Sequence, residues 1–346
     1  MPRYVLGIDG GGTRTRAAII DEAGRLQGLG LGGPGNYDDI GIDAVRENLS
    51  QAIAAARQDA VRQDAALTLQ TFDAAFLGLA GVVSANDQRI VRQIANELGL
   101  GVGGAVGVDH DCRIALAGAL SGRAGIVLIA GTGSACYGRT AGGKSWRAGG
   151  WGDLLADEGS GGWLGLQGLR LAVRSFDGRE RPSRLADDIK NALGLRDMNE
   201  IMHRIYHVGL SRKERAALAP LVLNAAREND EGAQQLIREA VEELALSVWA
   251  VARRLEMEEQ PEVAIVGGLY SSFTGSQAAV EDIFAAPLRA AIRRKVAGCR
   301  IQAAELSPVI GACLLALQHI GIDLLSVSAA LKASEMALAR VLDKQL

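Results

Sequence analysis

The stretch LGIDGGGTRTRAAIID, residues 6–21, decides the fold prediction. A short apolar run ends at Asp9, three glycines and Thr13 follow, and residues 14–20 then alternate between polar and apolar side chains. This order predicts a strand, a glycine turn and a second strand paired with the first. It does not match the dinucleotide-binding pattern G-x-G-x-x-G, because residues 10, 12 and 15 are Gly, Gly and Thr and a strand rather than a helix follows.

The chain after residue 21 predicts the rest of an α/β unit. Apolar runs and helical periodicity predict short strands and helices in alternation, closing near residue 120. The predicted strands lie at about 26–31, 76–80 and 105–108, and the predicted helices at about 43–59 and 87–98.

The same order then restarts, which predicts a duplicated domain. An apolar run over 126–130 leads into the turn Gly-Thr-Gly-Ser at 131–134 and a strand over 135–139. Thr13 and Thr132 therefore occupy equivalent points of two similar hairpins. We expect an N-terminal domain over 1–122 and a C-terminal domain over 123–323. A helix over 324–346 follows, and the sequence does not place its packing.

Composition narrows the class of protein. The 346 residues carry a net charge of −3, which provides no basic excess for binding nucleic acid or anionic lipid. No apolar run approaches 18 residues and the N-terminus has no signal-peptide pattern, so we expect a cytoplasmic protein. The four cysteines and four histidines show no spacing that indicates a disulfide framework, a zinc site or an iron–sulfur site. Glycine is in excess, at 44 residues, and this favours glycine turns.

Three glycine-rich turns each follow a short apolar strand, namely Asp9–Thr13, Gly131–Ser134 and Gly267-Gly268. Glycine lets backbone N–H groups approach phosphate oxygens closely, and a neighbouring hydroxyl adds a donor. Any one of these loops alone is equally well explained as a tight hairpin turn. Three such loops, two of them with threonine at matched positions, favour phosphate binding.

Residues 138–145, GRTAGGKS, match the P-loop pattern G-x-x-x-x-G-K-[ST]. A P-loop needs a helix that opens at its lysine, but Ser145 is followed by Trp-Arg-Ala-Gly-Gly-Trp-Gly, which propagates a helix poorly. We therefore predict a hairpin between strands 135–139 and 145–148.

Five stretches resemble the N-acetylglucosamine kinase family, in the BadF/BadG/BcrA/BcrD ATPase group of the actin–hexokinase–Hsp70 superfamily. They are LGIDGGGTRTRAAIID (6–21), VDHDCRIALAGAL (108–120), IAGTGSACYG (129–138), GGWGDLLADEGSGGW (149–163) and AIVGGLYSS (264–272). The resemblance implies an α/β fold of two RNase-H-like (actin-like ATPase) domains with an interdomain cleft for nucleotide and sugar. The implied reaction is ATP-dependent phosphorylation of an amino sugar, N-acetylglucosamine to its 6-phosphate, by a homodimer that uses Mg²⁺.

The resemblance also implies roles for individual residues. Asp9 would lie beside Mg²⁺ and Asp109 would be the catalytic base that also contacts the sugar. The ATP phosphates and adenosine would be bound by Gly11, Gly12, Thr13, Thr132, Gly133, Gly267 and Gly268. The sugar would be bound by Asn36, Ser134, Gly150, Trp151, Gly152 and Asp157. Alternative functions are a glucosamine kinase, the ATPase activator subunit of a radical dehydratase, and a sugar-responsive transcription regulator. The activator subunit would bridge an iron–sulfur cluster through paired cysteines.

The residues themselves leave several of these roles open. Asp109 follows a predicted strand and precedes a helix, where aspartate serves either as a base or as a helix N-cap. Asp111 fits the cap at least as well and would leave Asp109 free. Asp157 and Glu158 either accept hydrogen bonds from sugar hydroxyls or stabilise the start of the following helix. Asn36, after three glycines and a proline, is equally a turn residue.

Overall fold

The computed structural model describes residues 2–64, 71–257, 259–271 and 281–343. The chain divides into two compact units, one of Met1–Ala124 with Ala304–Leu346 and one of Gly125–Ala303. The first boundary lies two residues beyond the expected one. Residues 304–323 were expected in the second domain, but they belong to the first unit.

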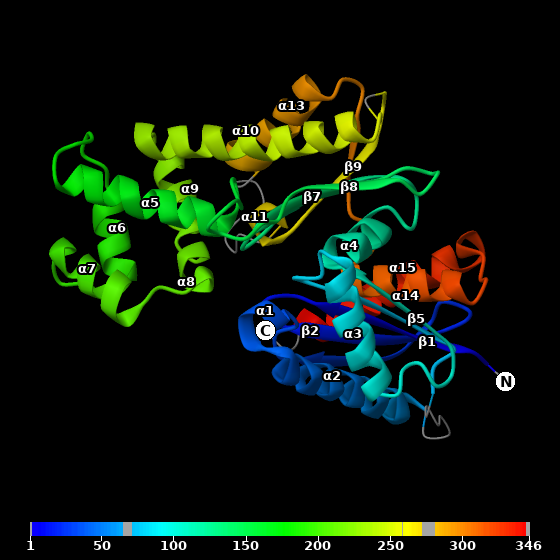
Figure 1. The fold of residues 1–346 in the computed structure, drawn as a ribbon. Coiled ribbons are helices and arrows are strands. Elements are labelled where there is room, and N and C mark those ends of the chain that lie inside the picture. Colours follow the sequence, from blue (N-terminus) through cyan, green and yellow to red (C-terminus); the bar gives the residue numbers. More distant parts are fainter. Residues whose placement is uncertain (1, 65–70, 258, 272–280, 344–346) are drawn as a thin grey trace. The chain divides into compact units, whose positions relative to one another are not determined.

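The first unit is built on a five-stranded sheet of order β3-β2-β1-β4-β5 (Figure 1). β1 pairs antiparallel with β2 and β2 antiparallel with β3, whereas β4 runs parallel to β1 and β5 parallel to β4. The strands are β1 Tyr4–Gly10, β2 Thr15–Asp21, β3 Leu26–Gly32, β4 Ala74–Leu79 and β5 Ala105–His110. This is the predicted RNase-H-like arrangement, with β1, β3, β4 and β5 all ending at one edge of the sheet.

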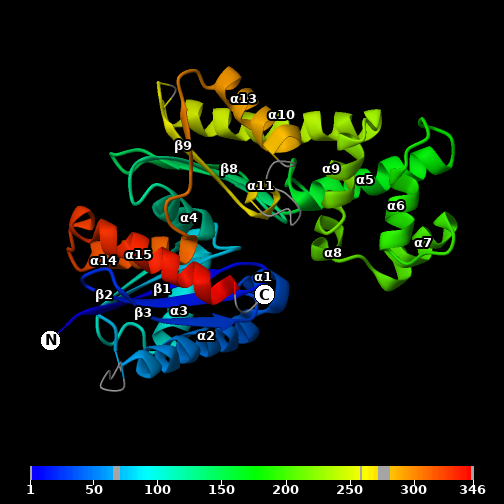
Figure 2. The ribbon, with the colours of Figure 1, turned by 180° about the vertical axis from the view of Figure 1, so that it is seen from behind.

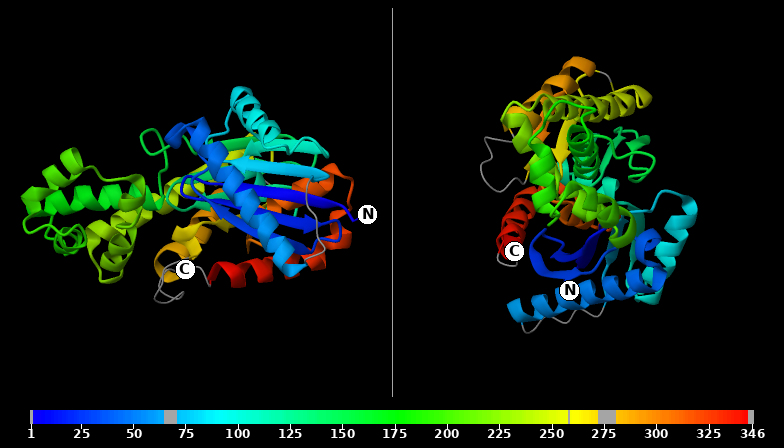
Figure 3. Two further views of the ribbon diagram at one scale, coloured as in Figure 1. Left: turned by 90° about the horizontal axis from the view of Figure 1, so that it is seen from below. Right: turned by 90° about the vertical axis from the view of Figure 1, so that its left-hand side faces the viewer.

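Helices cover both faces of this sheet. Alternation along β1 sends Leu6 and Ile8 into one hydrophobic core and Val5 into another. The first core is closed by α2 (Ile42–Gln63) and α3 (Ala85–Glu97), and α2 follows the short helix α1 (Tyr37–Ile40). Figure 3 shows α2, in blue, crossing one face of the sheet at an angle to the strands. The second core is closed by α4 (Asp111–Ala119), α14 (Pro308–His319) and α15 (Leu324–Asp343) (Figure 2).

The packing of α14 explains why residues 304–323 belong to the first unit. Gly7 of β1 faces this helix, and a Cβ there would lie 2.6 Å from Cys313 Sγ. Cys313 is fully buried, and its thiol hydrogen-bonds the Ala18 carbonyl of β2 at 3.4 Å. The helix thus sits directly on the central strands of the first sheet.

The C-terminal helix α15 packs against α14 and β3. The Ser334 hydroxyl accepts a hydrogen bond from the Leu26 N–H at 2.9 Å and donates one to the Gly24 carbonyl at 2.9 Å. Glu335 accepts hydrogen bonds from the N–H and the hydroxyl of Ser307, just before α14. These contacts fix a helix that the sequence alone did not place.

The second unit repeats the first sheet strand for strand. Its order is β10-β9-β6-β7-β8, with β6–β7 and β7–β8 antiparallel and β9 and β10 parallel to β6. The strands are β6 Gly125–Ala130, β7 Ser134–Arg139, β8 Ser145–Gly149, β9 Glu262–Val266 and β10 Arg300–Ala303. β6 therefore corresponds to β1, and the duplication predicted from the two threonine turns is confirmed.

The second unit is the more helical one. The long helix α10 (Glu231–Arg254) lies across β6, β7 and β8 and presents Val248 and Val251 to the core. Its described residues also form α5 Gly161–Phe176, α6 Leu185–Ala192, α7 Ile201–His203, α8 Arg212–Ala216, α9 Ala219–Arg227, α11 Gly268–Ser271 and α13 Ala286–Lys295. Short 3₁₀ and π-helical turns occupy Met198–Glu200, Arg204–Val208 and Glu281–Ala285. No helix in the described ranges is long and apolar enough to cross a membrane.

Residues 138–145 form the predicted hairpin. β7 and β8 pair through Gly138 opposite Trp146 and Arg139 opposite Ser145. The Thr140 N–H donates to the Lys144 carbonyl at 2.8 Å, and the Lys144 N–H donates to the Thr140 hydroxyl at 3.1 Å. No helix starts at Lys144, so the P-loop match is a coincidence of sequence.

We expect Lys144→Ala to leave nucleotide affinity and turnover within about twofold of the wild type, because exposed side chains away from a site contribute little. Isothermal titration with an ATP analogue and steady-state assays measure both quantities. Loss of nucleotide binding in this variant would restore the P-loop interpretation.

Candidate active site

The carboxyl-terminal edge of the first sheet carries two aspartates in register. Asp9 of β1 lies opposite Gly78 of β4, and Gly78 lies opposite Asp109 of β5. Residues paired in this way point to the same face, and two strand spacings separate the backbones of the aspartates by about 10 Å. Gly78 has no side chain, and the Ile114 side chain of α4 lies against it, where a Cβ would come within 2.6 Å.

Asp9 is a buried carboxylate with 9% of its surface exposed. Its Oδ2 accepts a hydrogen bond at 3.1 Å from Nη1 of Arg16, its neighbour on β2. Burial raises the pKa of Asp9 to about 6; the Arg16 cation opposes this rise and the nearby Asp111 carboxylate adds to it. Asp9 and Asp111 therefore provide two carboxylates that repel each other, and Asp9 is desolvated. Such a pair suits a hard cation, since Mg²⁺ prefers oxygen ligands. Asp9 thus fits its predicted role beside Mg²⁺.

The first glycine loop and Asn36 lie next to each other. The Gly35 N–H donates to the Gly11 carbonyl at 2.8 Å, and the Gly11 N–H donates to the Arg14 carbonyl at 3.0 Å. Gly12 and Thr13 between them are exposed. The loop is therefore a turn with its tip open to solvent, as phosphate binding requires.

Asn36 is the N-cap of α1. Its Oδ1 accepts a hydrogen bond from the Asp38 N–H at 3.2 Å, and its Nδ2 donates to Asp39 Oδ2 at 2.8 Å. The turn role that the residues alone suggested is thus present, and the sugar-binding role of Asn36 stays a prediction.

The helix after Asp109 is capped by a residue that the sequence did not single out. β5 continues to His110, two residues past its expected end, and α4 begins at Asp111. His110 is the N-cap, and its Nδ1 accepts a hydrogen bond from the Arg113 N–H at 3.2 Å. The expectation that Asp109 or Asp111 caps this helix is wrong. The Asp109 side chain is 29% exposed and accepts a local hydrogen bond from the adjacent His110 N–H at 2.9 Å. Its carboxylate is therefore available to act as a base.

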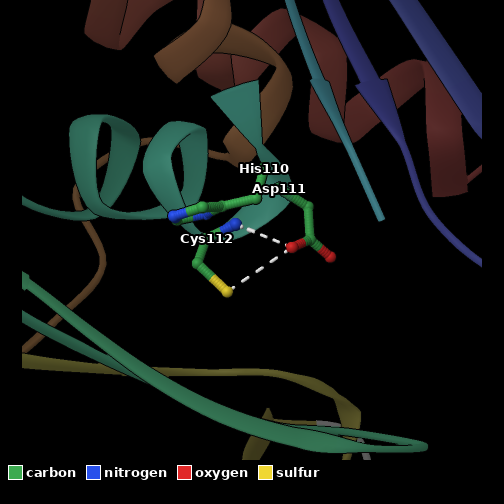
Figure 4. Close-up of side chains that lie close together, drawn as sticks. All are labelled: His110, Asp111 and Cys112. Carbon is green, nitrogen blue, oxygen red and sulfur yellow. Dashed lines mark hydrogen bonds between the residues drawn. The ribbon is translucent and has the colours of Figure 1, made fainter. Parts of the chain in front are cut away.

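His110, Asp111 and Cys112 form a cluster of possible metal-ligand atoms, all within 4.8 Å of one another (Figure 4). The spacing of cysteines and histidines in the sequence did not predict this cluster. Asp111 Oδ1 accepts hydrogen bonds from the Cys112 N–H at 2.8 Å and from its thiol at 3.4 Å, and Cys112 is buried. Together with the His110 cap, these bonds account for the cluster as the start of α4.

The second glycine loop closes on the start of α5. The carbonyls of Gly131 and Thr132 accept hydrogen bonds from the N–H groups of Gly161 and Gly162 at 2.8 and 3.0 Å. The loop's conformation is thereby fixed by the first residues of a helix, while Thr132 itself is exposed. This geometry leaves the Thr132 hydroxyl accessible to a ligand.

The third glycine loop lies beside the second, because β6 and β9 are parallel neighbours. A Cβ on Gly131 would lie 3.7 Å from the Gly268 nitrogen. Gly267 has a φ of +113°, and a Cβ there would overlap the Ala130 carbonyl. Gly267 is thus required for the close approach of the two loops.

Several predicted sugar residues also gather at this edge of the second sheet. The Ser134 N–H donates to Asp157 Oδ1 at 3.2 Å, and the Gly150 N–H donates to the Ser134 carbonyl at 3.1 Å. Gly150 and Gly152 both have positive φ values, which turn the chain around Trp151. Trp151 is 64% exposed, and the Arg147 guanidinium lies over its ring at 4.9 Å from the ring centroid.

Asp157 does not start the following helix. The N-cap of α5 is Ser160, whose hydroxyl accepts a hydrogen bond from the Trp163 N–H at 3.1 Å, and the first turn contains no acid. The helix-start interpretation of Asp157 and Glu158 is therefore wrong. Asp157 is buried and pairs instead with Arg212 of α8; burial raises its pKa, and the Arg212 cation opposes that rise.

Arg212 and Arg16 are site residues that the sequence did not reveal. Arg212 follows Ser211 in a capping box with Glu214, which is typical of an ordinary exposed helix start. Arg16 lies in an alternating strand, and only the strand pairing places it beside Asp9.

All four cysteines, Cys112, Cys136, Cys299 and Cys313, are buried at separate places in the two units. Burial raises the pKa of Cys313 to about 12 and also raises that of Cys136. Cluster ligands are thiolates, so this placement does not favour the electron-transfer activator.

The chain is similar to several known proteins. The model of the BadF/BadG/BcrA/BcrD ATPase family matches residues 6–316. The N-acetylmuramic acid/N-acetylglucosamine kinase of Clostridium acetobutylicum is 34% identical over 266 residues, which are 77% of this chain and 85% of that protein. The N-acetyl-D-glucosamine kinase of Dictyostelium discoideum is 27% identical over 318 residues, 90% of this chain and 97% of that protein.

A solved structure from Chromobacterium violaceum, named as a candidate N-acetylglucosamine kinase, is 30% identical with a TM-score of 0.70, covering 91% of this chain and 99% of that one. A ROK family glucokinase from Streptomyces griseus, 18% identical with a TM-score of 0.52, covers 91% of this chain and 99% of that one and shares the fold. Given the family match over most of its length, the chain belongs to the BadF/BadG/BcrA/BcrD ATPase family.

Proposed function

We propose that this protein is an ATP-dependent amino-sugar kinase that converts N-acetylglucosamine to its 6-phosphate. The names of the two relatives support the substrate class. The observation that carries the proposal is the position of Asp109, a partly exposed carboxylate at the end of β5. Asp109 is in register with the buried Asp9, and it does not cap α4 because His110 does.

Phosphoryl transfer needs phosphate-binding loops, a charge-neutralising metal and an aligned hydroxyl. Asp9 would hold Mg²⁺, with Asp111 adding negative charge nearby, and the bound ion would neutralise charge on the phosphates. Gly11, Gly12 and Thr13 would face the phosphates, and the donors to the phosphate oxygens would be the Gly12 N–H and the Thr13 hydroxyl, because the Gly11 N–H already closes the turn. Thr132 and Gly133 would also bind phosphate oxygens, and Gly267 and Gly268 would contact adenosine.

Asp109 would accept the proton of the sugar 6-hydroxyl as the phosphorus–oxygen bond forms. Ser134 and Asp157 would hydrogen-bond the ring substituents, and the Trp151 ring offers a flat apolar face. Asn36, Gly150 and Gly152 complete the proposed sugar contacts.

The deciding experiment is a coupled ADP-release assay across N-acetylglucosamine, glucosamine, N-acetylmannosamine, N-acetylmuramic acid and glucose. We expect the highest kcat/KM with N-acetylglucosamine, and phosphorus NMR identifies the product as the 6-phosphate. A preference for glucosamine would support the alternative kinase. No ADP release with any of the sugars would refute the proposal.

Replacing Thr132 by valine keeps the volume of the side chain and removes its hydroxyl. Because a hydrogen bond to a charged group contributes about 1.5–3 kcal/mol, we expect ATP affinity to fall about 10- to 100-fold, as measured by calorimetry. Thr140→Val, in the hairpin turn, is the matched control and should bind ATP normally. Unchanged ATP binding by Thr132→Val would mean that the second loop is only a structural turn.

A further inference from the structure

An ion pair with a buried carboxylate joins two segments of the second unit that lie 55 residues apart. Arg212, the first residue of α8, contacts Asp157 Oδ2 through Nη2. The Asp157 side chain is only 3% exposed, whereas that of Arg212 is 40% exposed. A carboxylate buried to this degree stays charged only when other groups compensate for its lost hydration.

The surroundings of Asp157 supply little compensation apart from Arg212. The Ser134 N–H donates one hydrogen bond to Oδ1, and the nearby Asp153 carboxylate opposes a second negative charge. Asp157 also has a φ of +67°, in the left-handed region that few non-glycine residues adopt. The position of this side chain is therefore set by Ser134 and Arg212.

Arg212 also lies against the second glycine loop. A Cβ on Gly133 would overlap the Arg212 guanidinium and lie 2.9 Å from one Asp157 carboxylate oxygen. The missing side chain of Gly133 therefore makes the room in which the arginine reaches the aspartate. The Arg212 Nε is buried and has no hydrogen-bond partner within the described residues, which leaves the contact through Nη2 to hold the guanidinium.

We propose that Arg212 is a positioning residue of the sugar site, which keeps Asp157 ionised and oriented to accept hydrogen bonds from sugar hydroxyls. This inference rests on the proposed function, and it assigns Arg212 to sugar affinity rather than to the phosphoryl-transfer step or to ATP binding.

The chain offers a matched control on the same helix. Arg215, three residues after Arg212, pairs with Asp153, which lies on the same loop as Asp157. The Asp153 side chain is 44% exposed, so water stabilises its charge without the arginine. Arg215→Gln therefore removes an arginine–aspartate pair from α8 without leaving a buried charge unpaired.

The first test is a separation of kinetic constants. We expect Arg212→Gln to raise the KM for N-acetylglucosamine about 10- to 100-fold, with kcat and the KM for ATP within about threefold. Arg212→Lys restores the positive charge and should recover most of the sugar affinity, and Arg215→Gln should resemble the wild type. A raised KM for ATP with an unchanged KM for the sugar would overturn the inference and make Arg212 a nucleotide ligand.

The second test is the pH profile of kcat/KM for the sugar. The charged groups that face the Asp157 carboxylate are Arg212 on α8 and Asp153 on its own loop. Removing Arg212 takes away the cation that lowers the pKa of Asp157 and leaves burial and Asp153, which raise it. As the pH falls, Asp157 should therefore become protonated at a higher pH in Arg212→Gln than in the wild type, and sugar affinity should be lost at that higher pH. If kcat/KM for the sugar falls at the same acidic pH in both proteins, the inference is contradicted.

The third test does not depend on activity. Arg212→Gln should lower the Tm by about 5–10 °C at pH 7.5 in the wild-type background and by clearly less in an Asp157→Asn background, where no buried charge is left unpaired. Equal Tm losses in the two backgrounds would refute the coupling. If the wild type phosphorylates no sugar, the proposed function fails, but these Tm values still show whether Arg212 and Asp157 stabilise each other. If the Tm values show this coupling and the KM for the sugar is unchanged in Arg212→Gln, only the positioning role is refuted.

Discussion

Asp109→Asn is expected to lower kcat by about 10²- to 10⁴-fold while the affinity for Mg·ATP changes by less than about threefold. Asparagine keeps the shape of the side chain and can still accept the hydrogen bond from the His110 N–H, but it cannot take up the proton of a sugar hydroxyl. Steady-state kinetics with saturating sugar measures kcat, and calorimetry measures ATP binding.

Asp73→Asn is the matched control, because Asp73 lies at the opposite end of the same sheet. Its Oδ2 accepts a hydrogen bond from the Tyr4 N–H at 2.8 Å, so the change should cost about 1 kcal/mol of stability and leave kcat intact. If Asp111→Asn loses kcat and Asp109→Asn does not, the base is Asp111. Full activity in both variants would remove this strand end from the active site.

The fold was largely predictable because its signals are local. The glycine–threonine turns after β1 and β6 each join two adjacent strands, and the repetition of these turns along the chain is enough to predict the duplication. The assignment of residues 304–323 failed because it depends on where α14 docks, and α14 packs against Gly7, whose missing side chain leaves room for the helix. Nothing near α14 in the sequence indicates a partner some 300 residues away.

The strand-end positions of the glycines and acids of the candidate site could be predicted from the sequence, but the contacts that depend on strand pairing could not. The capping residue was misassigned because aspartate is the usual N-cap, but the parallel pairing of β5 with β4 continues to His110 opposite Leu79. That pairing carries the strand past Asp109 and moves the cap to His110. Arg212 was missed for the same kind of reason, since its contact with Asp157 exists only in the folded unit.

Asp9→Asn is expected to abolish turnover and to stabilise the fold. Mg²⁺ contributes several kcal/mol to phosphoryl transfer, so loss of its carboxylate should lower kcat by at least about a hundredfold. The buried Asp9 has its pKa raised from 3.8 to about 6, so the folded protein holds this proton more tightly than the unfolded chain. The resulting contribution to stability is fully present below about pH 4 and is lost as the pH rises through about 6.

Above pH 6 and without metal, the asparagine variant should therefore be the more stable protein by up to about 3 kcal/mol, since about two pKa units separate the folded and unfolded states.

The control variant Asp21→Asn should have the opposite effect on stability. Asp21 is also buried, but it accepts hydrogen bonds from the N–H groups of Ala23 and Arg25 and from the Arg25 guanidinium, so its replacement should destabilise the fold at pH 7.5. Urea unfolding between pH 4 and 8 measures both variants, and added Mg²⁺ should raise the Tm of the wild type but not that of Asp9→Asn. An Asp9→Asn protein whose Tm still rises with Mg²⁺ would place the metal elsewhere, because this variant lacks the carboxylate that is proposed to bind the ion.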